Sequence, residues 1–156
     1  MPVSLTTVVQ FLAILLLGLV AGSVFGIWRG YDPTTFSPQA FLEAHQGAVR
    51  GLNTLLPATA LASLACVAVL AFLARSRPAA LALYLIAIVG IVAGGVVTRF
   101  FNQPINADVI SWTAQTLPSN WEEIRDDWWR WHQVRVAVTI AGFMALIAGA
   151  LADRSP

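Results

Sequence analysis

Residues 79–98 read AALALYLIAIVGIVAGGVVT and contain no charged side chain. A helix of about 20 apolar residues is long enough to cross the hydrocarbon core of a membrane. Three further apolar runs occur in the chain, at residues 5–28, 51–74 and 136–152. The last run is short, but one more helical turn through Arg135 and His132 extends it to residues 132–152. The sequence therefore predicts four transmembrane helices.

The composition agrees with a chain embedded in a membrane. Of the 156 residues, 58% are hydrophobic and 11% are charged, and lysine is absent, whereas soluble domains have about 25% charged residues. The first run lacks a positively charged flank and is longer than the apolar stretch of a signal peptide, so we expect it to be a helix of the mature protein. We predict an all-α integral membrane protein, with residues 1–156 in a single membrane domain.

Four spans place both chain ends on one side of the membrane and the loops 29–50 and 99–131 together on the other side. The short connector carries Arg75 and Arg77, and Arg154 lies on the same side. Because arginine concentrates in short cytoplasmic segments, we expect cytoplasmic termini and a location in a bacterial plasma membrane. The single cysteine, Cys66, falls within an apolar run, so no disulfide framework is expected.

Small residues recur at helical spacing in three of the four spans. These are Gly18, Gly22 and Gly26 in the first, Gly90 and Gly94 in the third, and Ala141, Ala145 and Gly149 in the fourth. Faces of small residues let membrane helices approach closely, although a groove for a flat ligand is the alternative. We expect a compact, antiparallel four-helix transmembrane bundle. Membrane lipids are expected partners, and a homo-oligomer is left open.

The first of the two long loops contains a helix start. Ser37 can cap a helix whose first position is Pro38, so the second helix is expected to begin before its membrane span. Gly47 and Gly51 should weaken this extension, because glycine lowers helix stability.

The second loop also contains helix signals. Pro104 disfavours a helical conformation at Gln103, which predicts that the third helix ends near Asn102. Asn106 is then expected to cap a short amphipathic helix that bears Val109, Ile110 and Trp112. Ser119 and Glu122 match a capping box, so the fourth helix should begin outside the membrane. Both loops are therefore predicted to be structured.

A polar stripe descends along the predicted fourth helix. Spacing of three and four residues aligns Arg125, Trp128, His132, Arg135 and Thr139 on one face. Ionisable side chains at membrane depth are costly, usually face the bundle interior and mark sites. This makes His132 and Arg135 the main candidates for chemistry. The alternative is that Arg135 extends to the interface and His132 is merely interfacial.

Further polar side chains fall at the same mouth of the predicted bundle. Asn102 and Asn106 lie at the end of the third span, and Arg50 and Asn53 lie at the start of the second. Asparagine is a common turn and cap residue, but the convergence at one mouth indicates a site. We therefore place Arg50, Asn53 and His45 among the candidate substrate-binding residues.

Tryptophan is distributed unevenly. All six tryptophans lie on the looped side of the chain, whereas an ordinary aromatic belt occupies both membrane interfaces. We expect Trp112 and Trp128 to line a pocket for a flat or apolar molecule, with an interfacial belt as the alternative. The predicted ligand is a small aromatic or lipophilic compound.

No metal site is expected. Glu43, His45 and His132 carry ligand atoms, but Glu43 and His45 point in nearly opposite directions on a helix. The chain has no HxxxH, ExxH or CxxC spacing. Nucleotide-binding loops and basic patches are also absent, so no nucleic-acid partner is expected.

Several of these motifs occur together in one known family. The motifs are Phe101-Asn102-Gln103-Pro104-Ile105-Asn106, then Trp112, Trp121 and Trp128, then His132 to Arg135, with Gly22 to Gly26 and Leu52 to Pro57 upstream. In this order they resemble the anthrone oxygenase family of small four-helix membrane proteins. Some fungal members of that family oxidise anthrones to anthraquinones with O₂.

The resemblance implies a mechanism for this chain. An anthrone has an acidic methylene whose enolate reacts directly with O₂, so no cofactor is expected. His132 would be the catalytic base, and Arg135 with Asn102 or Asn106 would stabilise the enolate oxygen. Trp112 and Trp128 would stack on the tricyclic substrate. The alternative function is a non-enzymatic membrane protein that binds a lipid, a quinone or a partner subunit at its tryptophan-rich mouth.

Overall fold

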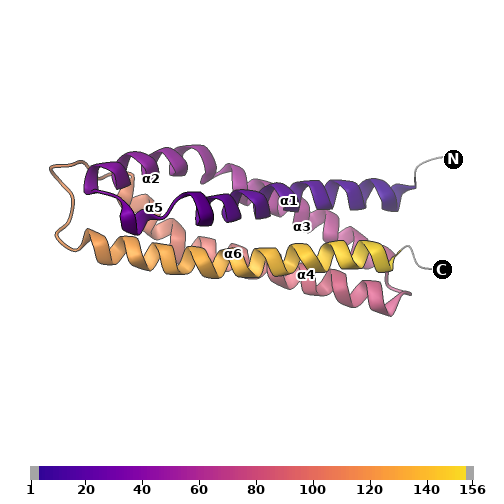
Figure 1. The fold of residues 1–156 in the computed structure, drawn as a ribbon. Coiled ribbons are helices and arrows are strands. Elements are labelled where there is room, and N and C mark those ends of the chain that lie inside the picture. Colours follow the sequence, from indigo (N-terminus) through magenta and orange to yellow (C-terminus); the bar gives the residue numbers. More distant parts are fainter. Residues whose placement is uncertain (1–3, 154–156) are drawn as a thin grey trace.

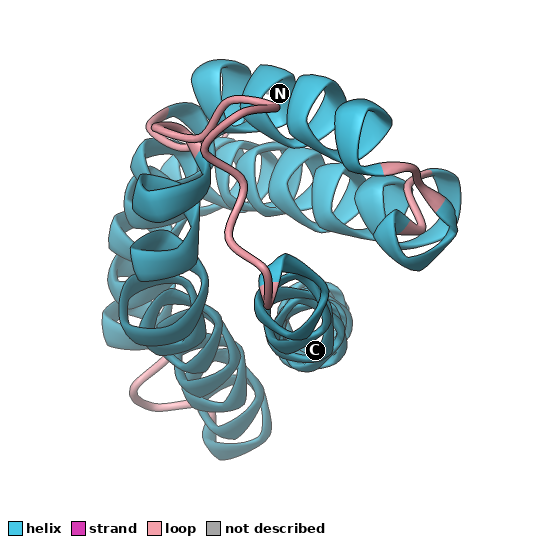
Figure 2. Cartoon of the chain, turned by 90° about the vertical axis from the view of Figure 1, so that its left-hand side faces the viewer, coloured by secondary structure: helices cyan, strands magenta, loops and turns pink. Residues whose placement is uncertain are grey.

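The computed structural model describes residues 4–153, and every regular element in this range is a helix (Figures 1 and 2). The elements are α1 (Leu5–Gly30), η1 (Pro33–Thr35), α2 (Pro38–Leu52), α3 (Leu55–Leu73), α4 (Pro78–Val97), η2 (Thr98–Asn102), α5 (Gln103–Val109) and α6 (Trp121–Ala152). Four of the helical segments are long and apolar enough to cross a membrane. The predicted four-helix membrane bundle is confirmed, and the chain is a membrane protein.

The long helices run side by side, with both chain ends at one end of the bundle (Figure 1). Segments α2 and α5 and the 110–120 loop lie at the opposite end, which we call the loop end. Both predicted loops are thus together and largely helical. Arg154, which contributed to the predicted orientation, lies outside the described residues.

The two halves of the bundle are packed differently. The main apolar core lies towards the terminal end, where its buried side chains include Leu17, Val67, Leu70, Tyr84 and Leu146. The loop end instead carries most of the buried polar side chains. The terminal half therefore supplies a rigid base, and the loop half is where a site can form.

A polar cluster closes the terminal end. Asp153 forms an ion pair of 2.7 Å with Arg77 and accepts a hydrogen bond of 3.1 Å from Gln10. Gln10 also donates to the Tyr84 hydroxyl at 3.1 Å. These contacts join α1, α4 and the end of α6, so they hold the chain ends in place relative to one another.

Close backbone contact between α4 and α6 depends on glycine. A Cβ atom added to Gly90 would lie 2.7 Å from the Cα of Gly142, and one added to Gly149 would lie 2.9 Å from the Tyr84 ring. Gly142 was not part of the predicted stripe. In α1 the predicted stripe holds at Gly18, where an added Cβ would lie 3.3 Å from the Phe143 ring of α6, but not at Gly22 or Gly26, where it would meet nothing within 4 Å.

We expect Gly90→Ala to lower the free energy of unfolding by about 1–3 kcal/mol, the usual cost of overpacking, because α4 and α6 must separate to admit the methyl group. Gly95→Ala is the matched control on the same helix, since its Cβ would meet nothing within 4 Å. Thermal unfolding in detergent, followed by circular dichroism, measures both variants. Equal stability of the two variants would contradict this account of the α4–α6 contact.

The second membrane segment is broken between α2 and α3. As predicted, α2 begins at Pro38 and the side chain of Ser37 caps it. The helix continues through Gly47 and Gly51 and ends at Leu52, so the break is not at the glycines. Pro57 explains its position, because a proline has no N–H for the carbonyl four residues earlier and its ring collides with that carbonyl. The carbonyl in question belongs to Asn53.

The third helix does not end near Asn102, contrary to the prediction. The chain passes from α4 through a π-helical turn, η2, directly into α5. In this wider turn the N–H of Gln103 bonds to the carbonyl of Thr98, a register that accommodates Pro104 without leaving the helical path. Asn106 is therefore a buried residue inside α5 and not a cap.

The fourth helix begins outside the apolar stretch, as predicted, but at a different residue. Its first residue is Trp121, and Asn120 occupies the cap position without a side-chain capping hydrogen bond. The predicted helix start was therefore wrong by one residue, and the predicted capping box of Ser119 and Glu122 was wrong. Helix α6 continues to Ala152, which at 1.5 Å per residue makes it about 48 Å long. It connects the loop end to the terminal end in one piece.

Candidate functional site

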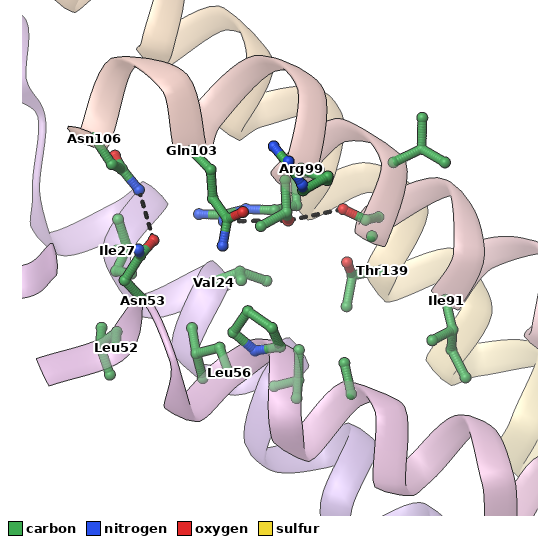
Figure 3. A pocket seen from close by; sticks show the side chains of 18 of the residues that line it. Val24, Ile27, Leu52, Asn53, Leu56, Ile91, Arg99, Gln103, Asn106 and Thr139 are labelled. Atoms are coloured by element: carbon green, nitrogen blue, oxygen red, sulfur yellow. Dashed lines mark hydrogen bonds between the residues drawn. The ribbon is translucent and has the colours of Figure 1, made fainter. Parts of the chain in front are cut away.

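A cavity of about 470 Å³ lies in the loop half of the bundle (Figure 3). Its walls come from α1, α2, α3, α4, η2, α5 and α6 and are mostly apolar, with side chains such as Val24, Leu56 and Ile91. Its size falls within the roughly 300–1,000 Å³ typical of small-molecule sites. The polar side chains in its wall are concentrated towards the loop end and are Tyr31, His45, Asn53, Thr98, Arg99, Gln103, Asn106, Arg135 and Thr139.

Arg135 is the charged side chain that reaches the cavity from α6. None of the ion pairs in residues 4–153 includes Arg135. Its Nη1 donates a long hydrogen bond of 3.5 Å to the Thr98 hydroxyl, and its buried Nε atom has no partner. A cation held this way is costly inside a membrane, and the Arg135 guanidinium forms part of the cavity wall.

His132 accepts a hydrogen bond from the Arg135 guanidinium. Arg135 Nη2 lies 2.7 Å from His132 Nδ1, and because a guanidinium can only donate, Nδ1 carries no proton. His132 Nε2 lies 3.1 Å from the carbonyl oxygen of Val24, which can only accept, so Nε2 carries the proton. His132 is therefore a neutral imidazole with both ring nitrogens occupied.

A second polar group is centred on Asn106. Trp128 Nε1, which can only donate, bonds Asn106 Oδ1 at 2.8 Å and so sets the orientation of the amide. His45 Nε2 lies 3.1 Å from the same oxygen and must donate to it. In the neutral imidazole Nδ1 is then the acceptor, and it receives the Tyr31 hydroxyl at 3.2 Å. Asn106 thus orients His45 with its basic lone pair towards Tyr31.

The two other predicted asparagines have different roles in the structure. Asn106 Nδ2 donates to Asn53 Oδ1 at 3.0 Å, which links α5 to the break between α2 and α3 (Figure 3). Asn102 is fully buried and donates to the Trp128 carbonyl at 3.1 Å. Asn53 and Asn106 line the cavity, whereas Asn102 does not.

Aromatic rings join the two polar groups. The rings of Trp128 and His132 are stacked with their centroids 5.0 Å apart, and the His45 ring meets Trp128 edge-on at 4.6 Å. Trp128 lines the cavity and is buried. Its position therefore fixes the spacing between His45 and the His132–Arg135 pair.

Two predicted substrate-binding residues lie outside the cavity wall. Arg50 is exposed on α2. Trp112 packs with Phe41, Leu42 and Val109 in a separate apolar cluster at the loop end. The other seven predicted site residues either line the cavity or hydrogen-bond to residues that do.

Tyr31, Thr98, Arg99 and Gln103 line the cavity but were not predicted as site residues, and the first two hydrogen-bond to residues that were. Tyr31 follows the last turn of α1, and its hydroxyl reaches His45. Thr98 begins the π-helical turn and contacts Arg135. The only sequence signal for either is its position at the end of an apolar run, which many polar residues share.

Potential metal ligands are scattered in the described part of the chain. Within the described part of the chain, no three or more side chains of His, Cys, Asp or Glu come together in a group that could hold a metal ion. Both nitrogens of His45 and both of His132 already face protein atoms. A metal ion at either imidazole would have to displace one of these contacts.

Comparison with known proteins gives one relationship. No curated protein and no solved structure matches the chain. The sequence model of a family described as anthrone oxygenase matches residues 46–145, a range that begins in α2 and ends in α6 and contains most of the cavity wall. Since this match covers more than half of the 156 residues, the protein belongs to the anthrone oxygenase family.

Proposed function

We propose that this protein is a membrane-embedded oxygenase that converts an anthrone-type substrate into a quinone with O₂. The observation that carries the proposal is the Arg135 guanidinium, which lines an apolar cavity without a carboxylate partner in the described chain. Family membership supports an oxygenase-like activity. The substrate class and the roles of individual residues are our inference.

The chemistry of an anthrone matches such a site. An anthrone is a flat tricyclic ketone whose central methylene is acidic, because loss of its proton makes the middle ring aromatic. The negative charge then resides largely on the former ketone oxygen. A fixed guanidinium N–H in a water-poor cavity stabilises this oxygen more than it stabilises the neutral ketone, which lowers the barrier to deprotonation.

His45 is the better placed base of the two histidines. His132 has its lone pair occupied by Arg135, whereas His45 Nδ1 is shared only with the Tyr31 hydroxyl. Tyr31 and His45 both line the cavity. Tyr31 can pass its proton to Nδ1 while its oxygen takes the proton from the methylene carbon, with Asn106 holding the imidazole in position. His132 then acts as a positioning residue for Arg135.

The remaining steps use O₂ as the only co-reactant. The enolate transfers one electron to O₂, and the two radicals combine to form a carbon–oxygen bond and a peroxide anion. The proton held at His45 converts this anion into a hydroperoxide. Loss of water, in which the remaining C–H bond and the O–O bond break, yields the second carbonyl. One anthrone and one O₂ thus give one quinone and one water.

The test uses purified protein in lipid nanodiscs with anthrone and dissolved O₂. Quinone formation is followed by absorbance and O₂ uptake by an electrode. We expect saturable quinone formation above the spontaneous rate, with one O₂ consumed per quinone. A rate equal to that of empty nanodiscs, with 1,8-dihydroxyanthrone tried as a second substrate, would overturn the proposed activity and favour a role in binding alone.

The orientation of the protein is part of the proposal. Arg75 and Arg77 lie in the short connector between α3 and α4, at the end of the bundle that carries the termini (Figure 1). Arginine in a short connector favours the cytoplasmic side. We therefore place the termini in the cytoplasm of a bacterial cell and the loop end, with α2 and α5, on the outer side of the plasma membrane.

A further inference from the structure

The side chains that line the cavity differ in exposure from helix to helix. Lining residues on α1, α2, α5 and α6 are buried or partly buried. The exposed ones all belong to α3, α4 and η2: Leu61, Val92, Gly95, Val96, Arg99 and Phe100. Leu61 and Phe100 are each 66% exposed. The cavity therefore reaches the outer surface of the bundle between α3 and α4, where membrane spans face lipid.

Each of the other three seams between the long helices is bridged by a close contact. Gly90 on α4 and Gly142 on α6 are in backbone contact. A hydrogen bond of 3.1 Å joins His132 on α6 to the Val24 carbonyl on α1. On the remaining seam, the Ser63 hydroxyl of α3 donates to a backbone carbonyl of α1 at 3.2 Å. The lining residues on α1 and α6 are also buried or partly buried, unlike those on α3 and α4.

The loop end is packed by α2, whose Phe41 and His45 are almost completely buried. The Gln46 side chain donates to the carbonyls of Val109 and Trp112, both at 2.9 Å. These bonds fasten α2 to α5 and the following loop. A ligand coming from water would have to break this layer.

We propose that the ligand enters the cavity sideways from the bilayer, through the opening between α3 and α4. This inference rests on the proposed function for its ligand class: a planar ketone or phenol that dissolves in the membrane and carries one oxygen able to accept from Arg135. An acyl chain or the apolar face of a second copy would leave the cation without a partner. Arg99, exposed at the rim, meets the polar edge of the ligand before Arg135 does.

The test changes the rim of the opening. Leu61→Phe/Val96→Phe narrows the opening, and Leu61→Ala/Val96→Ala widens it. The matched control is Val89→Phe, because Val89 is also on α4 and 67% exposed but does not line the cavity. Binding of 1,8-dihydroxyanthraquinone to protein in phosphatidylcholine nanodiscs is followed by stopped-flow quenching of tryptophan fluorescence. Trp128 is expected to be quenched because it lies in the cavity wall.

We expect the narrowed variant to bind and release the probe about tenfold more slowly, which corresponds to a barrier higher by about 1.4 kcal/mol. Both rate constants should fall together, because an obstructed opening raises the barrier and not the energy of the bound state. The widened variant should show faster rates than the wild type, and Val89→Phe should match the wild type. The widened variant keeps the test decisive if the narrowed one does not fold.

Three results would overturn the lateral route. Unchanged rates in both rim variants would place the entrance elsewhere. A fall in the association rate alone would mean that the rim is part of the binding wall. An absence of saturable binding by the wild type would show that the cavity does not take planar ketones or phenols, so that the proposed ligand class is wrong. By contrast, a wild-type protein that shows the expected rim effects but forms no quinone would overturn the proposed oxygenase and leave the lateral route standing.

Discussion

Arg135→Gln is expected to lower kcat for anthrone oxidation by roughly 10²–10³-fold, the usual effect of removing one preorganised donor to a developing oxyanion. The physical reason is that glutamine keeps a hydrogen-bond donor but removes the positive charge that faces the cavity. KM should change little, because the interaction strengthens mainly in the transition state. Steady-state rates of quinone formation in nanodiscs measure both parameters.

Stability separates a catalytic role of Arg135 from a structural one. A buried cation without an ion-pair partner costs folding energy, so Arg135→Gln should keep or raise the midpoint of thermal unfolding. Arg130→Gln is the matched control, because Arg130 lies on the same helix but is exposed and paired with Asp127. A parallel loss of activity and stability in Arg135→Gln, with Arg130→Gln unaffected, would assign Arg135 to structure and remove the basis of the proposed mechanism.

His45→Gln is expected to lower kcat by roughly 10²–10⁴-fold, the range typical of a lost general base. Glutamine can still donate to Asn106 but has no lone pair basic enough to receive the substrate proton. Removal of the methylene proton from the substrate should then be the rate-limiting step. Anthrone deuterated at the methylene carbon should therefore show a larger isotope effect on kcat in this variant than in the wild type.

His132→Gln is the comparison that tests the choice of base. A glutamine carbonyl can still accept from Arg135, so we expect a loss of less than about tenfold and no change in the isotope effect. If instead His132→Gln raised the isotope effect and His45→Gln did not, the base would be His132, as the family resemblance implied, and Arg135 would have to move from Nδ1 during the reaction.

The membrane architecture could be predicted because its causes are local. Span length and the absence of charge are properties of contiguous residues. A single apolar segment in a bilayer forms a helix because it must satisfy its own backbone hydrogen bonds. The same is true of the start of α2, where Ser37 and Pro38 act within one turn. The failures occurred where a local signal had two structural solutions. Pro104 can end a helix or follow a wide turn, and the chain here takes the wide turn.

The chemistry of the site was only partly accessible from the sequence. Helical spacing correctly placed His132 three residues from Arg135 on one face of α6. It could not show which atoms face which ring nitrogen, and this decides the protonation of each histidine. The contact of His45 with Asn106 spans 61 positions of the chain, and that of His132 with Val24 spans 108. Such pairings depend on how the helices pack.

The sequence by itself therefore determined the number of spans, the grouping of both loops at one end and the polar stripe on the last helix, because all three follow from the order of apolar and polar residues along the chain. Only the tertiary structure decided that Arg135 lines the cavity without a carboxylate partner in the described chain, that His132 Nδ1 bonds to Arg135 while His45 Nδ1 bonds to Tyr31, and that the exposed lining residues belong to α3, α4 and η2. The reason is physical: partners, burial and access are set by contacts between distant helices, which packing alone brings together.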